Sequence, residues 1–582
     1  MSVFEVRNDG FYYDDNKMPV LSGAMHYFRT LPEYWEDRLK KLKACGLNTV
    51  ETYIAWNIHE KREGEFDFTG IADIERFIEI AGSLGLFVIL RPSPYICSEW
   101  DFGGLPAWLL ADKNINVRCS CPLYLEKVTN YYKELIPRLT KYQCTNGGPV
   151  IMFQIENEYG SYGNDKKYLR YLKDLMIELG VNVQLFTSDG GTFTHLNGGT
   201  LPEVFKVANF GGWPDEDFNC LAEFQPNMPL MCGEFWNGWF DHFGEDHHVR
   251  DLANYEKCLD RLFEMGGNIN IYMFHGGTSF GWMAGANHGG KYEPDVSSYD
   301  YDALLDEAGN ITEKYRITQR IIKKYFGDFE APEFPKTPAK AYNDITFTEQ
   351  AYLFDCMDSV AKKFHTASAL TMERYGQNYG FICYKTTVPY YKETILTIEA
   401  PHDRAHIFIN GERQAIIYRN DENKTVKVSF PEKENTLEIF VDTLGRVNFG
   451  HHLHDRKGLD CPVLIAGFQE LFGWDVSCIE LDDISVVPFK ECSDNVSGPT
   501  FLRSKFNIDE TPVDTYLRLD NFARGQIWVN GFNLSRYWVT VGPQKTFYIP
   551  ACLLKQGENE IIIFETDSSI GLTASFTAAP EL

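Results

Sequence analysis

Acidic and aromatic residues lie together in two short segments of the sequence. Glu156 and Glu158 are separated by one residue, and Glu234 stands shortly before Trp236 and Trp239. Two carboxylic acids in an aromatic pocket can break a glycosidic bond, because one protonates the leaving oxygen while the other attacks or supports the anomeric carbon. Aromatic rings also bind sugars by stacking on the apolar faces of a pyranose. The two segments therefore indicate carbohydrate chemistry.

Short apolar strands that alternate with amphipathic helices must position these acids. This alternation is typical of a parallel sheet wrapped by helices. Eight strand-like runs end near Ala24, Tyr53, Arg91, Glu156, Ser188, Asn209, Glu234 and Phe274. Eight units predict a (β/α)8 TIM barrel over residues 1–328, in which catalytic side chains follow the carboxyl ends of the strands. Glu158 and Glu234, after strands four and seven, are then expected to face each other across the barrel mouth. Glu156 and Glu158 would point the same way if strand four continued through them.

The second half of the chain has the pattern of an all-β protein. A proline-rich linker at residues 329–344 separates it from the barrel, and alternating runs follow. Two segments of this half recur, residues 407–411 as 527–531 and residues 434–440 as 558–564. The repeat predicts two related β-sandwiches, over residues 345–470 and 471–582. Strands from residues 345–395 could instead belong to the second sandwich.

The charge of the chain excludes several classes of partner. Its formal net charge is −27, from 55 Lys and Arg against 82 Asp and Glu, and no basic stripe offsets this excess. We therefore expect neither nucleic acid nor an anionic membrane as a partner. No apolar run reaches the length of a transmembrane helix, and the first residues lack the pattern of a signal peptide. We accordingly expect a soluble, cytoplasmic protein.

Cysteines and histidines give no clear pattern of a metal site. The 14 cysteines are scattered, several of them in apolar stretches, and are expected to be reduced thiols. Cys119 and Cys121 form a close pair, but no second pair stands at the spacing of a zinc site. His451, His452 and His454 form a histidine cluster from which no ligand geometry can be read. We expect no metal and no cofactor.

The chain resembles the glycoside hydrolase family 35 β-galactosidases over essentially its whole length. The resemblance is carried by several long motifs, which are residues 47–60, 64–68, 91–100, 154–160, 234–244 and 298–302. It implies a retaining exo-β-galactosidase with Glu158 as the acid/base and Glu234 as the nucleophile. The same matching leaves Glu156 structural. The two sandwiches resemble jelly-roll, galactose-binding modules.

The resemblance also implies which residues hold the sugar. The galactose ring would be bound by Tyr53, Cys97, Ser98, Glu99, Asn157, Tyr272 and Tyr301. Asn157 would bond the 2-hydroxyl, and Tyr272 would support the nucleophile. Trp236 and Trp239 are expected at the rim, where they would stack on the sugar beyond the scissile bond, with Phe449 closing the far side.

Two departures from the family pattern bear on specificity. Ser93 and Ser98 stand where relatives often have Gly and Ala. Trp236 stands where the animal lysosomal branch has Tyr, which is similar to the shorter bacterial branch and implies a preference for β1,3-linked galactose. The expected partner is a galactosyl oligosaccharide or glycoconjugate substrate. The sequence leaves open whether the protein forms a homodimer.

Two other functions remain as alternatives. A glycosidase of the same clan with another substrate, such as an exo-β-glucosaminidase, would keep both acids and change the residues that meet C2 and C4. A non-catalytic carbohydrate-binding protein would use the two sandwiches. The intact pair Glu158 and Glu234 argues against the binding protein, which has no need for both.

Overall fold

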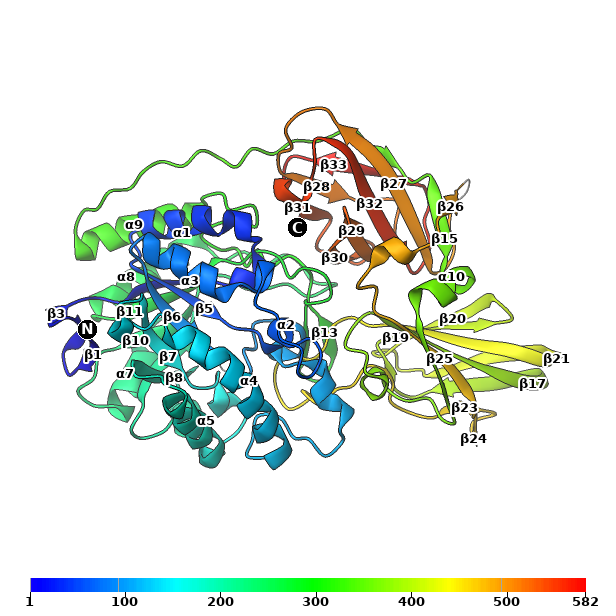
Figure 1. Cartoon of the computed structure of the whole chain (residues 1–582), viewed down its shortest axis with the longest axis horizontal. Helices are drawn as coiled ribbons and strands as arrows, with labels where there is room; N and C mark the ends of the chain where they lie inside the picture. Colours follow the sequence, from blue (N-terminus) through cyan, green and yellow to red (C-terminus); the bar gives the residue numbers. More distant parts are fainter. Residues whose placement is uncertain (1, 93, 493–494) are drawn as a thin grey trace.

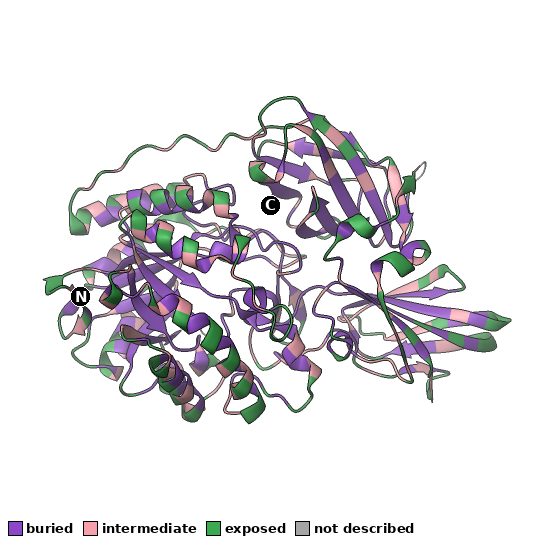
Figure 2. Cartoon of the chain, in the orientation of Figure 1, coloured by how far each residue is buried: buried purple, intermediate pink, exposed green. Residues whose placement is uncertain are grey.

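The computed structural model describes residues 2–92, 94–492 and 495–582. Figure 1 shows a barrel, drawn in blue to green, beside two β-rich regions drawn in yellow and in orange to red. The barrel strands are buried along most of their length (Figure 2). Within the described residues, no helix combines the length and the apolar character needed to cross a membrane.

Eight parallel strands close into a barrel in the order β10-β11-β4-β5-β6-β7-β8-β9. Their bounds are β4 (Leu21–Met25), β5 (Thr49–Tyr53), β6 (Phe87–Arg91), β7 (Val150–Gln154), β8 (Gln184–Gly190), β9 (Phe205–Phe210), β10 (Met231–Trp236) and β11 (Asn268–His275). The helices between and after them are α1 (Trp35–Ala44), α2 (Trp56–His59), α3 (Ile74–Ser83), α4 (Pro122–Thr140), α5 (Lys166–Glu178), α6 (Phe193–Gly199), α7 (Asp215–Phe224), α8 (Leu252–Glu264) and α9 (Glu313–Phe326). The predicted (β/α)8 barrel is confirmed.

A small amino-terminal sheet packs against the barrel at the end where the strands begin. It consists of β1 (Phe4–Arg7), β2 (Gly10–Tyr13) and β3 (Asn16–Lys17). Phe4 and Phe11 share a buried cluster with Ile151, Phe205 and Met231 of the barrel strands. Because apolar side chains fill this end, a polar site has room only at the opposite, carboxyl end.

The chain then crosses to the β-rich half through residues 329–344, which run as an extended segment along the top of Figure 1. The chain enters one sandwich first, returns to it after the other has been completed, and ends in it. We call it the terminal sandwich. One of its sheets has the order β14-β33-β28-β31 and the other β26-β15-β27-β32-β29-β30. The strands are β14 (Ile345–Thr346), β15 (Glu349–Tyr352), β26 (Lys490–Glu491), β27 (Thr500–Ile508), β28 (Thr515–Arg518), β29 (Arg524–Val529), β30 (Phe532–Trp538), β31 (Thr546–Ile549), β32 (Gly557–Glu565) and β33 (Thr573–Thr577).

The region between β15 and β26 forms the middle sandwich, which begins after α10 (Leu353–Val360). Its sheet has the path β16-β25-β17-β21-β19-β20, to which β23 and β24 are added. The strands are β16 (Lys362–Thr366), β17 (Phe381–Ile398), β19 (Arg404–Ile409), β20 (Glu412–Tyr418), β21 (Thr425–Asp442), β23 (Val463–Ile465), β24 (Gln469–Glu470) and β25 (Trp474–Ile479). The middle sandwich is therefore inserted into the terminal one.

The expected boundary between the two sandwiches at residue 471 is wrong. Strand β25, which was assigned to the second sandwich, pairs with β16 and β17 of the middle sheet. The alternative that strands from residues 345–395 belong to the second sandwich is confirmed for β14 and β15, which join the terminal sheets, but not for β16 and β17, which pair within the middle sheet. Alternation reveals that a segment is a strand but not its partner, and here Glu349 pairs with Arg503, 154 positions away.

The sequence repeat corresponds to the same turn in both sandwiches. Asn410 and Asn530 each have a left-handed φ, of 50° and 49°, and each precedes a glycine in a hairpin between two strands. Each Asn side chain donates to the amide oxygen of a second Asn on the neighbouring strand, Asn435 at 3.0 Å and Asn559 at 2.9 Å. The two recurring segments are thus the two sides of one hydrogen-bonded unit.

The barrel and the sandwiches share contacts. Trp282, from the loop after β11, lies in one buried cluster with Phe381 and Phe440 of the middle sandwich and Trp528 and Phe564 of the terminal sandwich. A loop of the middle sandwich also reaches the barrel mouth. There Tyr95 donates to the Asn448 carbonyl at 2.6 Å. The loop that carries Phe449 is fixed by this contact.

Candidate active site

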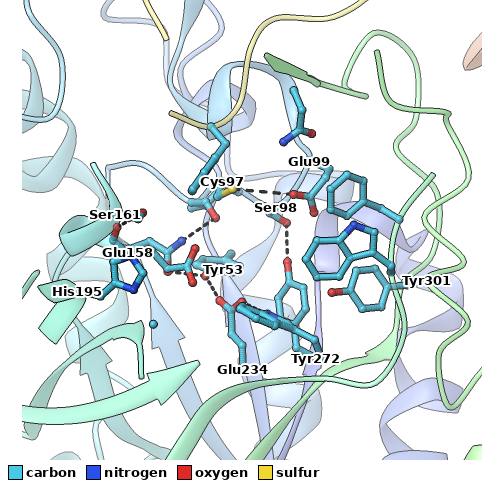
Figure 3. A pocket seen from close by; sticks show the side chains of 18 residues that line it. Tyr53, Cys97, Ser98, Glu99, Glu158, Ser161, His195, Glu234, Tyr272 and Tyr301 are labelled. Atoms are coloured by element: carbon cyan, nitrogen blue, oxygen red, sulfur yellow. Dashed lines mark hydrogen bonds between the residues drawn. The ribbon is translucent and has the colours of Figure 1, made fainter. Parts of the chain in front are cut away.

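The carboxyl ends of the barrel strands surround a pocket of about 310 Å³ (Figure 3). Its lining residues are Tyr53, Ile96, Cys97, Ser98, Glu99, Asn157, Glu158, Ser161, Gly190, His195, Glu234, Trp236, Trp239, Phe240, Tyr272, Asn287, Tyr301 and Phe449. Every residue that the sequence analysis assigned to catalysis or sugar binding lies in this lining. Strands β7 and β10 are separated by β8 and β9 on one side, so their acids meet across part of the mouth.

Glu234 lies within strand β10, and three donors hold its carboxylate. The Tyr53 hydroxyl donates to Oε1 at 2.6 Å, and Arg91 Nη2 lies 2.8 Å from the same oxygen. The Trp236 indole N–H donates to Oε2 at 3.0 Å. These three donors fix the position of the two carboxyl oxygens in the pocket, where a carboxylate can act as a nucleophile.

Glu158 follows strand β7 and points into the pocket from a left-handed residue, with φ 44° (Figure 3). Its amide donates to the Ser188 carbonyl at 3.0 Å, which ties this turn to strand β8. Asn209 Nδ2 donates to its carboxylate at 2.9 Å. Burial, and then the negative charge of Glu234, raise the pKa of Glu158 to about 7. A carboxyl group with this pKa can both give and take a proton near neutrality.

Glu156 points away from the pocket, because strand β7 ends at Gln154 and does not continue through the two acids. Glu156 has a left-handed φ of 56°. Its carboxylate pairs with the buried Arg118 at 2.9 Å and accepts from the Tyr168 hydroxyl at 2.9 Å. The side chain therefore has a full set of structural partners.

Asn157 presents its amide nitrogen to the pocket. Its oxygen accepts from Arg91 at 2.8 Å and from Gln154 at 3.1 Å, and it lies 2.7 Å from the Tyr53 hydroxyl, whose single proton is the one donated to Glu234. Within the described ranges, its nitrogen has a single long contact, 3.4 Å, to the Ile96 carbonyl. Because the oxygen is fully used, the NH2 group is the part that can meet a sugar hydroxyl.

Among the described residues the Tyr272 hydroxyl makes no hydrogen bond to Glu234, and its expected support of the nucleophile stays a prediction. The Tyr272 hydroxyl contacts Ser98 Oγ at 3.3 Å and the Tyr299 hydroxyl at 3.2 Å. The phenol that donates to Glu234 comes instead from Tyr53, at the end of strand β5. Tyr272 still lines the pocket, so it remains placed to meet the substrate.

Three consecutive residues with left-handed φ form the wall opposite Glu158. They are Cys97, Ser98 and Glu99, with φ of 58°, 62° and 47°. Arg29 Nη1 donates to Ser98 Oγ at 2.8 Å, and the Tyr299 hydroxyl donates to Glu99 at 2.5 Å. Burial raises the pKa of Glu99 to about 7. Ser93, the other departure from the family pattern, lies outside the described residues.

The aromatic residues divide into two groups. Trp236 is half-buried and bonded to Glu234, so it lies beside the nucleophile and not, as expected, only at the rim. Trp239 is 40% exposed and packs edge-on against Trp236, with ring centroids 5.8 Å apart. Phe449 reaches the lining from the middle sandwich. Trp239 and Phe449 are therefore two rings that could meet a sugar beyond the galactose.

Several residues of the site were not singled out from the sequence. Arg91 and Asn209 stand at or near the ends of strands β6 and β9, so the rule that found the two acids could have found them too. Ser161, His195 and Asn287 come from loops or short elements beyond the strand ends. Ser161 could have been found from its position three residues after Glu158, whereas no spacing in the sequence connects His195 or Asn287 with the pocket.

Among the described residues, no group of three or more His, Cys, Asp or Glu side chains could hold a metal ion. In the histidine cluster, the rings of His451 and His452 pack together with centroids 4.1 Å apart, and His454 accepts from the Val117 amide at 3.2 Å. Within the described residues, no disulfide bond joins two of the 14 cysteines. The pocket offers carboxylates, phenols, amides and indoles, which is the chemistry of acid–base catalysis on a polyol.

Comparison with known proteins agrees with this site. A family described as "Glycosyl hydrolases family 35" matches residues 10–325. Two further families match residues 369–481, as the first all-beta domain of beta-galactosidase, and residues 499–559, as its galactose-binding domain.

Full-length relatives show the same agreement. Beta-galactosidase 17 of Arabidopsis thaliana is 38% identical over 97% of this chain and 87% of its own length. Beta-galactosidase-1-like protein 3 of Homo sapiens is 38% identical over 95% of this chain and 86% of its own, and the beta-galactosidase of Bos taurus is 37% identical over 97% and 90%. The chain belongs to glycosyl hydrolase family 35.

Proposed function

We propose that this glycoside hydrolase removes terminal, non-reducing β-D-galactosyl residues with retention of configuration. The observation that carries the proposal is the unequal environment of the two glutamates. Arg91, Tyr53 and Trp236 all contact the carboxyl group of Glu234, whereas burial and the charge of Glu234 raise the pKa of Glu158 to about 7. Two such carboxyl groups divide the roles of nucleophile and acid between them.

In this mechanism, the Glu234 carboxylate attacks the anomeric carbon while Glu158 gives its proton to the leaving oxygen. The products of this step are a galactosyl ester of Glu234 and the free alcohol. Glu158, now ionised, then takes a proton from water, whose oxygen attacks the same carbon and releases Glu234. The choice of galactose is supported by family membership and by relatives named beta-galactosidase.

Stereochemistry tests the mechanism. Anomeric proton signals followed during the first turnovers should show β-galactose as the initial product. Initial release of α-galactose would exclude the double displacement. A matched β-N-acetylglucosaminide separates this function from that of a glucosaminidase, because it should be hydrolysed at a much lower rate than the galactoside.

Two variants test the separate roles of the acids. Glu234→Gln should abolish turnover of every substrate, since no ester can form. Glu158→Ala should retain much more activity on a dinitrophenyl galactoside, whose leaving group needs no proton, than on a disaccharide. Added azide should restore turnover of Glu158→Ala by attacking the ester. Equal loss on both substrates, without rescue by azide, would remove the acid/base role from Glu158.

We further propose a preference for β1,3-linked over β1,4-linked galactose. The support is the exposed Trp239 at the rim, with Phe449 in the same lining, since only a particular tilt of the second sugar allows flat stacking. Trp239→Ala should lower kcat/KM about tenfold on the β1,3 disaccharide, more than on a nitrophenyl galactoside. Trp239→Phe should restore part of the difference. A wild-type preference for lactose would refute this linkage.

A further inference from the structure

Ser161 and His195 line the pocket, and among the described residues neither side chain bonds the carboxyl group of Glu158 or Glu234. Figure 3 shows both residues beside Glu158, on the side of the pocket away from Glu99 and Tyr301. Ser161 follows Glu158 by three positions, and His195 lies in α6. They form an edge of the pocket that the proposed galactose contacts do not use.

The proposed reaction indicates which part of the substrate lies beside Ser161 and His195. A general acid must lie within hydrogen-bond reach of the oxygen that it protonates. With Glu158 as the acid, the leaving oxygen lies at Glu158, and the group attached to that oxygen extends away from the galactose contacts. Side chains that flank Glu158 on its outer side therefore meet the leaving group.

Two glycines allow His195 to pack closely against the turn that carries Glu158. A Cβ atom on Gly160 would lie 1.8 Å from the His195 carbonyl oxygen, and one on Gly190 would lie 2.5 Å from His195 Nδ1. Both distances are shorter than any real contact, so larger residues would push α6 away from the Glu158 turn. The turn and the helix are thus built to pack directly on each other.

Both side chains keep free hydrogen-bonding atoms. Thr192 Oγ1 lies 3.1 Å from Nδ1 of His195, and in the part of the chain that the structure describes no protein group bonds Nε2. The Ser161 hydroxyl donates to the Glu158 carbonyl at 2.7 Å, so its oxygen keeps lone pairs for an incoming donor. His195 is half-buried and its ring is oriented by Thr192, which reduces the entropy lost when it binds.

We infer that Ser161 and His195 form the polar edge of a leaving-group subsite that selects a hydroxyl-bearing sugar. This inference rests on the proposed function, because Glu158 must be the acid. One hydroxyl of the leaving sugar meets His195 Nε2, and a neighbouring hydroxyl donates to Ser161 Oγ. An aryl leaving group has no hydroxyls for this edge and gains nothing from it.

The test compares a galactosyl disaccharide with nitrophenyl galactoside. For His195→Ala, the ratio of kcat/KM for the disaccharide to that for the aryl galactoside should fall about five- to tenfold, the effect of one lost hydrogen bond. Thr194→Ala, an exposed neighbour in the same helix, is the matched control and should leave the ratio unchanged. His195→Gln, which keeps a polar end, should recover part of the loss.

A second measurement avoids the acid step. Wild-type enzyme trapped as a 2-fluorogalactosyl ester should be reactivated faster by added glucose or N-acetylglucosamine than by buffer alone, and His195→Ala should lose most of this acceleration. An unchanged substrate ratio together with unchanged reactivation would overturn the subsite. If wild-type enzyme fails to hydrolyse nitrophenyl galactoside, the proposed function itself is wrong, which is a distinguishable result.

Discussion

Removal of the Asn209 amide should move the pH range in which the enzyme is active. Asn209 Nδ2 donates to the Glu158 carboxylate at 2.9 Å and so favours its ionised form. In the wild type, the acid is lost as pH rises through its pKa of about 7, so kcat/KM on a disaccharide should fall above that pH. Without the donor, Glu158 holds its proton to higher pH, and the alkaline limb should move upward.

The size of the shift follows from the strength of that bond. A hydrogen bond to a charged group contributes about 1.5–3 kcal/mol, and about 1.4 kcal/mol corresponds to one pKa unit. Because water can replace the amide in an open pocket, Asn209→Ala should move the limb by about one unit. Asn209→Asp is the sharper variant, since it places a second carboxylate beside Glu158, and like charges oppose ionisation. Its limb should move further than that of Asn209→Ala.

The assay is the pH profile of kcat/KM on a galactosyl disaccharide, with dinitrophenyl galactoside as the control. The control needs no proton from Glu158, so its alkaline limb should be weak in every variant. The reasoning is refuted if the limb moves to lower pH in either variant. It is also refuted if the wild type shows the same alkaline limb on both substrates, because Glu158 would then not be the group that titrates.

Three further outcomes are expected. Tyr53→Phe should lower kcat/KM about 10- to 100-fold on aryl galactosides and disaccharides alike, since Glu234 loses a donor in both reactions; a loss confined to disaccharides would contradict this. Asp442→Ala should destabilise the protein by about 3–5 kcal/mol, because it leaves the buried Arg524 without its main partner, and calorimetry should show a lowered transition. Asp520→Ala, at an exposed pair, is its control and should change stability by less than about 1 kcal/mol. EDTA should leave the rate unchanged, and a loss restored by zinc or magnesium would point back to the histidine cluster.

The barrel was predictable because each strand is a short apolar run and each helix shows the spacing of apolar residues typical of an amphipathic helix. The acids were predictable because catalytic groups follow strand ends in this fold. The direction of Glu156 was not, since it depends on left-handed residues at 156 and 158 that alternation cannot express. His195 reaches the pocket through the close packing of helix α6 on Gly160, a contact between distant segments that no local pattern encodes.

The insertion of the middle sandwich into the terminal one constrains the order in which the chain folds during synthesis. Strands β14 and β15 leave the ribosome first, but their partners β27 and β33 follow only after the whole middle sandwich has been made. The middle sandwich can therefore complete its sheet while the two early strands still expose unpaired edges. If translation stopped before residue 573, β14 would lack its partner β33, although the barrel would already have been synthesised. During synthesis, the terminal sandwich is accordingly the part of this protein most in need of a chaperone.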